Sequence, residues 1–191
     1  LALHELSITD PNNEPLISIG SFTIAVDTLN IKSDLYNFGS ISLVTPFLKL
    51  ERFDNETNFS RLVRYTTSDT TEVQDSVNVQ VNSGNIFELI ASYIQDISEN
   101  YSISNYKADS LILREGTLFF NDYTLHSKFN YHLEHLLAKA ERINSENQHI
   151  TFLLSALLNT SGKMNGKVLV NPNGFRDITI DYSVSDLKIS D

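Results

Sequence analysis

The sequence predicts an α+β fold: a long, curved, mainly antiparallel β-sheet with one amphipathic helix packed on it. Several stretches alternate apolar and polar residues with the period of two that half-buried strands require. One further stretch, 85–99, spaces its apolar residues three and four apart, as one face of a helix does. The chain has 191 residues, of which 41% are apolar, so it is long enough to bury a sizeable core.

Two strands are predicted at the start of the chain, over 1–9 and 16–27, joined by the turn-forming residues 10–13. The apolar phase of the second strand differs on the two sides of Gly20, which predicts a bulge or bend there. A short helix near 33–37 is expected next, because serine and aspartate suit its start and a glycine suits its end.

The stretch 41–62, ISLVTPFLKLERFDNETNFSRL, predicts a strand, a charged turn and a short helix near 58–64. Pro46 lacks a backbone donor, so this strand needs either an edge position or a bulge at that residue. Asn58 is expected to cap the helix that carries Phe59.

The best helix is predicted over 85–99. Its polar face carries no lysine or arginine, whereas helices that lie on membranes usually do. We therefore expect it to pack on one face of the sheet. Its apolar stripe consists of Ile86, Leu89, Ile90, Tyr93, Ile94 and Ile97.

The second half of the chain predicts further antiparallel strands. A hairpin is expected over 106–124, turning at Arg114-Glu115-Gly116, and a buried strand over 150–158. A closing hairpin is expected from 163–170 and 178–189, around the turn-forming residues 171–174.

This organisation suggests three segments: a first β unit over 1–64, a polar linker over 65–84, and a helix with a second antiparallel β unit over 85–191. The chain begins with Leu1, and the pattern LSITD at 6–10 returns as LKISD at 187–191. We therefore expect it to be one continuous piece of a longer protein.

One pattern in this chain resembles AsmA-like proteins, which are large periplasmic proteins of the Gram-negative envelope related to TamB and to bridge-like lipid transporters. The pattern is a strand I-x-L-x-x-P-x-L-x-L, a short acidic turn, and N-[FW]-x-x-L. The residues that carry it here are Ile41, Leu43, Pro46, Leu48, Leu50, Asn58, Phe59 and Leu62.

The resemblance implies a non-catalytic periplasmic segment that serves outer-membrane biogenesis and phospholipid transport between membranes. It also implies an inner-membrane anchor outside this segment. For 128–143, helix propensity and strand alternation disagree; the resemblance favours a strand, and we predict a strand.

Composition excludes several classes of site. The net charge is −10, from 14 basic and 24 acidic residues, which disfavours binding to nucleic acid and anchoring of this segment to anionic lipid head groups. The chain has no cysteine, so disulfides, thiolate catalysis and cysteine-ligated metals are excluded. No run of eighteen apolar residues is present, so no membrane-spanning helix is predicted.

Catalytic and metal-binding motifs are also missing. His132 and His135 match neither zinc-binding pattern, and on a strand their odd separation places them on opposite faces. No phosphate-binding or nucleophile-elbow motif occurs. We predict no enzyme activity, no cofactor and no metal, and assign no catalytic residue.

Our hypothesis for function is that the sheet forms a trough that carries lipid. A sheet with one apolar and one polar face can shelter acyl chains on the apolar face while head groups remain at the wet edge. Two other hypotheses stay open, a β-rich cell-surface binding or adhesion module and a hydrolase with distant carboxylates. Candidate trough liners are Phe22, Ile24, Val26, Ile180, Tyr182 and Val184.

Overall fold

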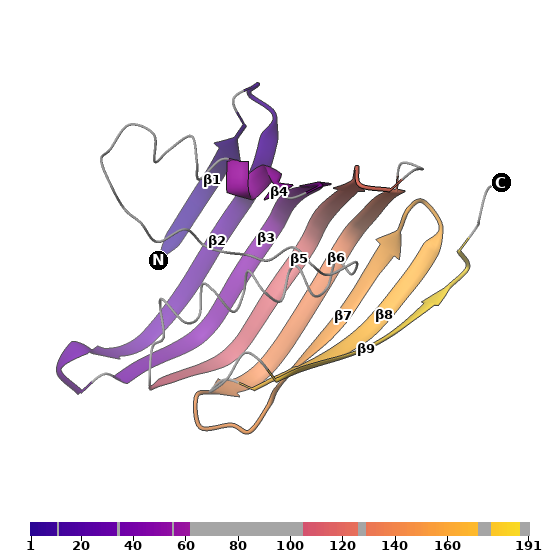
Figure 1. Ribbon diagram of the computed structural model, residues 1–191. Helices are drawn as coiled ribbons and strands as arrows, with labels where there is room; N and C mark the ends of the chain where they lie inside the picture. The colour runs from indigo at the N-terminus through magenta and orange to yellow at the C-terminus, as the bar shows by residue number, and fades with distance from the viewer. Residues whose placement is uncertain are drawn as a thin grey trace.

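The computed structural model describes residues 1–10, 12–33, 35–54, 56–61, 105–125, 129–171 and 177–187. Their strands form one curved sheet in the order β1-β2-β3-β5-β6-β7-β8-β9, with β4 paired to β3 (Figure 1). The strands are β1 (Ala2–Thr9), β2 (Pro15–Asn30), β3 (Leu35–Phe53), β4 (Glu56–Thr57), β5 (Tyr106–Asp122), β6 (Phe129–Asn144), β7 (Ile150–Leu158), β8 (Gly162–Val170) and β9 (Ile178–Ser185).

The predicted α+β class is wrong. Strands make up 79% and helices 5% of the described residues, and none of the helices described reaches seven residues. The helix expected at 85–99 lies outside the described residues. Near 33–37 the chain instead forms a 3-10 turn, η1 (Ile31–Ser33), and then enters β3, because pairing with β2 and β5 outweighs the local helix-start signal.

The helix expected at 58–64 is a single helical turn over 58–61 in the described part of the chain. Its cap is Thr57 and not Asn58. The Thr57 side chain accepts a hydrogen bond from Ser60 N at 3.2 Å, and the Ser60 hydroxyl accepts one from Thr57 N at 2.9 Å. This reciprocal arrangement frees the Asn58 side chain for another role.

The sheet is antiparallel except at its centre, where β3 and β5 run parallel with Tyr36 beside Tyr106 and Leu48 beside Leu118. Strands from the first 57 residues and strands from 106 onward therefore share one continuous sheet. The strand predicted over 128–143 is confirmed as β6.

The hairpin predicted over 106–124 is wrong, because β5 passes straight through Arg114-Glu115-Gly116 as one strand. Glu115 has a φ of 52° and forms a bulge, in which one extra residue bends the strand without reversing it. Pro46 lies in the central strand β3 and not at an edge. Thr45 before the proline has a φ of 48°, and the pairing with β5 is interrupted at Thr45-Pro46 and resumes in the same register at Phe47.

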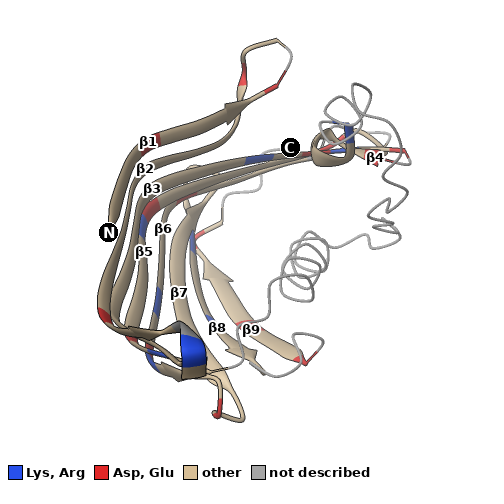
Figure 2. Cartoon of the chain, turned by 90° about the vertical axis from the view of Figure 1, so that its left-hand side faces the viewer, with Lys and Arg blue, Asp and Glu red and all other residues tan. Residues whose placement is uncertain are grey.

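Bulges lie side by side across the sheet. Glu5, Thr45, Glu115 and His135 all have positive φ, and the register places Glu5 opposite Gly20, Gly20 beside Thr45, and Thr45-Pro46 beside Glu115-Gly116. Together they make a crease that runs across five strands. Figure 2 shows the strands bending into a trough whose axis crosses them.

Each bulge keeps the apolar residues on one face. Along the strands, successive residues of the apolar face are two positions apart. At a bulge they are three positions apart, as are Leu3–Leu6, Leu113–Gly116 and Leu133–Leu136. The polar residues between them fall on the outer face. A second, shorter crease follows the same rule, with Arg142 (φ 53°) opposite Asp109.

Two core clusters lie on the same face of the sheet. One contains Leu50, Leu118, Phe120, Leu133, Ala156, Leu158 and Met164, and the other contains Ala108, Ala140, Ile143 and Ile150. Strand β7 contributes even-numbered residues to both clusters and pairs with β8 without a register shift. These side chains are less than a tenth exposed, whereas His135 and Lys163 on the other face are 63% and 66% exposed. Each bulge places two successive residues on the polar face, so that face is the longer, convex one and the apolar face is the inside of the curve.

Candidate functional site

The candidate site is the concave apolar face. It is buried over the central strands and becomes accessible on the outer strands. Rows of paired residues cross it from strand to strand; one such row is Leu3, Phe22, Leu43, Leu113, Ala138, Leu154, Gly166 and Tyr182. The face is thus continuous from β1 to β9.

The accessible part on β1 and β2 is called the open flank here. Its five most exposed members are 41% to 54% exposed, which is unusual for leucine, isoleucine and valine gathered on one face. The open flank consists of Leu3, Leu6, Ile8, Phe22, Ile24, Val26 and Leu29.

All six predicted liners lie on this concave face. Phe22, Ile24 and Val26 belong to the open flank, paired with Leu43, Ile41 and Phe38. The other three, Ile180, Tyr182 and Val184, lie on β9 at the opposite side of the sheet and pair with Val168, Gly166 and Met164. The two predicted groups are therefore separated by the buried central strands and do not meet.

Sequence reasoning missed the β1 residues of the open flank. The change of phase between Leu3 and Leu6 suggested only an irregular strand. The structure shows that Glu5, with a φ of 56°, interrupts the alternation and returns Leu6 to the face of Leu3, while the pairing with β2 keeps its register across Glu5. The signal available in the sequence was the spacing of three, with two polar residues between the leucines.

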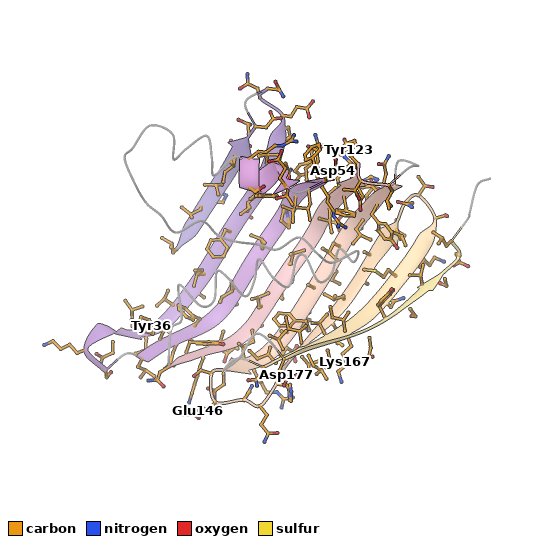
Figure 3. All side chains as sticks on the ribbon, viewed as in Figure 1. Tyr36, Asp54, Tyr123, Glu146, Lys167 and Asp177 are labelled. Carbon is orange, nitrogen blue, oxygen red and sulfur yellow. The ribbon has the colours of Figure 1, made fainter. Side chains whose placement is uncertain are left out.

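The face ends at two rims, formed by the strand ends. Figure 3 shows Asp54 and Tyr123 at the upper rim, and Tyr36, Glu146 and Asp177 at the lower rim. The upper rim is closed beside β3, because Phe59 of the helical turn packs against the cluster that contains Leu50.

Asn58 holds this closure in place. Its side-chain amide donates to Lys49 O at 2.7 Å and accepts from Glu51 N at 3.0 Å and Phe59 N at 3.1 Å. Lys49 O and Glu51 N belong to β3 and lie beyond its last pairing with β2, which joins Ile17 to Leu48. The side chain therefore continues the ladder where β2 has ended.

The upper end of the open flank is acidic. Two backbone N–H groups, from Glu14 and Asn12, donate to the Asp10 carboxylate, and the Glu14 contact contributes most to lowering the Asp10 pKa. Lys49 is the nearby cation, and it is neutralised by Glu14 at 2.6 Å and Glu51 at 3.5 Å. The hydrogen bond to Glu14 is the main cause of its raised pKa.

The two histidines lie on the convex face, so the expectation of opposite faces is wrong. The bulge at His135 (φ 49°) changes the phase of β6. His135 Nδ1 lies 2.6 Å from Glu115 Oε2, while the His132 ring stacks on Phe119 with centroids 3.9 Å apart. Within the described ranges, no group of three or more histidine and carboxylate side chains is placed to hold a metal ion.

Comparison with known proteins gives no assignment: no protein-family model matches the chain, and no curated protein matches it. In the part of the chain that the structure describes, no helix has the length and apolar character needed to cross a bilayer.

Proposed function

We propose that the concave face holds the acyl chains of envelope lipids, and that the chain is a non-catalytic periplasmic segment of an AsmA-like protein that moves phospholipid between membranes. The observation that carries the proposal is the continuous apolar face with its open flank. The resemblance at Pro46 and Asn58-Phe59 agrees with it.

The energetics favour acyl chains as the occupant. Each methylene moved from water onto an apolar surface gains roughly 0.8 kcal/mol. A trough without fixed polar contacts on its floor binds a chain without fixing its position, so the lipid can slide. The open flank follows β2 from Phe22 to Leu29, a span of roughly 23 Å at about 3.3 Å per residue. That span exceeds the roughly 15 Å depth of acyl chains in one leaflet.

The test is lipid capture by the purified chain. The protein is incubated with phospholipid vesicles and re-isolated, and the bound lipid is measured by mass spectrometry. The wild type is expected to retain phospholipid. Leu3→Glu places a carboxylate on the open flank and is expected to reduce the retained lipid several-fold.

Ala2→Glu is the matched control. Ala2 is the preceding residue of the same exposed strand, and it points to the convex face. It should leave lipid retention at the wild-type level. Equal retention by both variants, or no lipid on the wild type, would contradict the proposal.

A further inference from the structure

The open flank has two chemically different ends. Its upper end carries Asp10 and Glu14, and the cation beside them, Lys49, is already paired with carboxylates. Its lower end carries Lys32 in the turn η1. Among the described residues, no carboxylate lies within ion-pair distance of Lys32, whose side chain is exposed. Asp27 of β2 lies near this lower end too, with its carboxylate beside Gly39 of β3. Among the described residues, the cation at the lower end is therefore free of ion pairs, whereas the cation at the upper end is paired.

The backbone that carries Lys32 is held by hydrogen bonds from its own turn. The Asn30 side chain accepts hydrogen bonds from Lys32 N at 3.2 Å and Ser33 N at 3.3 Å, which fixes the turn. Directly behind the turn, Leu29 pairs with Tyr36. The lysine is thus carried by an ordered turn at the lower rim, next to the last apolar residues of the flank.

Two tyrosines lie side by side at this rim. Tyr36 pairs with Tyr106, and Tyr106 packs against the lower core cluster on the concave face. Tyrosine suits the border between an apolar surface and water, because its ring is apolar and its hydroxyl is polar. The lower rim has the chemistry of a lipid–water interface, and Figure 3 shows Tyr36 at that rim.

We propose that the phosphate group of a glycerophospholipid binds at Lys32, with its glycerol region over Tyr36 and its acyl chains along Leu29, Val26 and Ile24. This inference rests on the proposed function. The lengths agree, because an acyl chain of about 15 Å covers four or five strand residues at about 3.3 Å each. That distance corresponds to the interval from Leu29 to Ile24.

The experiment compares two lipids that share the same acyl chains. Phosphatidylglycerol carries the phosphate and diacylglycerol lacks it, and each carries an acyl-chain fluorophore for titration. Lys32→Gln is expected to weaken phosphatidylglycerol binding about tenfold, the effect of losing one hydrogen bond to a charged group. Diacylglycerol binding should stay unchanged, and Lys32→Arg should restore phosphatidylglycerol binding.

Lys163→Gln is the matched control. Lys163 is an exposed lysine of β8, distant in the sheet from the open flank, and it is paired with Asp186 at 3.0 Å. It should affect neither lipid.

The inference is overturned if Lys32→Gln leaves phosphatidylglycerol binding unchanged or weakens both lipids equally. It is also overturned if soluble glycerol phosphate competes as strongly as the lipid, which would indicate a site for free phosphate. If the wild type binds diacylglycerol but Lys32→Gln has no effect, only this inference fails. If the wild type binds neither lipid, the proposed function fails as well.

Discussion

Replacing Asn58 by alanine tests how the upper rim is closed. Asn58 is 8% exposed, and its side chain satisfies Lys49 O and Glu51 N, two backbone groups that β2 does not reach. Each buried polar group left without a partner costs about 1–3 kcal/mol. Because water can reach part of the rim, we expect a loss of about 3 kcal/mol, or a fall in melting temperature of roughly 6–12 °C.

Thermal and urea denaturation followed by circular dichroism measure this loss. Asn147→Ala is the control, since Asn147 makes one side-chain hydrogen bond to backbone, to Arg142 O at 2.9 Å, in an exposed turn. It should cost about 1 kcal/mol or less. If Asn58→Ala melts within about 2 °C of the control variant, the side chain does not continue the ladder of β3 and the reasoning is refuted.

Three further changes test the packing and the crease. Phe59→Ala should destabilise the fold by about 3 kcal/mol in urea denaturation, and Phe59→Leu by less than half of that, since leucine refills most of the space; equal losses would contradict the packing. Gly20→Ala should cost about 2 kcal/mol because its new Cβ would collide with Thr45 Oγ1, and the cost should be much smaller in the Thr45→Gly background; an equal cost of Gly20→Ala in both backgrounds would show that the two residues do not touch. The pKa of His135 is raised above 6.5, chiefly by the hydrogen bond to Glu115, so the stability from this pair is present below 6.5 and is lost as pH rises through the raised pKa. An NMR titration should show that pKa fall in Glu115→Gln, and an unchanged value would refute the pairing.

The sequence reveals the sheet because alternation survives in nearly every strand. At 128–143 alternation and helix propensity disagreed, the resemblance decided for a strand, and the structure confirms that prediction as β6. The prediction from sequence failed where one local pattern is compatible with two different structures. Arg114-Glu115-Gly116 has the composition of a hairpin turn, but the same residues also suit a bulge. The matching irregularities at Thr45 and His135 in the neighbouring strands favour a bulge over a hairpin turn at these residues. The local sequence at 114–116 contains no sign of those neighbours.

The candidate site was visible only in part for a similar reason. Phe22, Ile24 and Val26 alternate cleanly, so sequence inspection places them on one face. Their exposure depends on the strands that flank them, and β2 is next to the edge strand β1. Two further residues of the open flank, Leu3 and Leu6, are separated by three positions, a spacing that departs from the period of two.

The alignment of the bulges makes curvature a collective property of the sheet. Deleting Glu115 alone would return β5 to a regular spacing while β3 and β6 kept their extra residues, so β5 would lose register with both neighbours along half its length. Straightening the trough would require matching deletions in every creased strand at once. Single-residue insertions and deletions at these positions should therefore be poorly tolerated, although the bulge residues are polar and exposed, and substitutions there should be accepted much more readily.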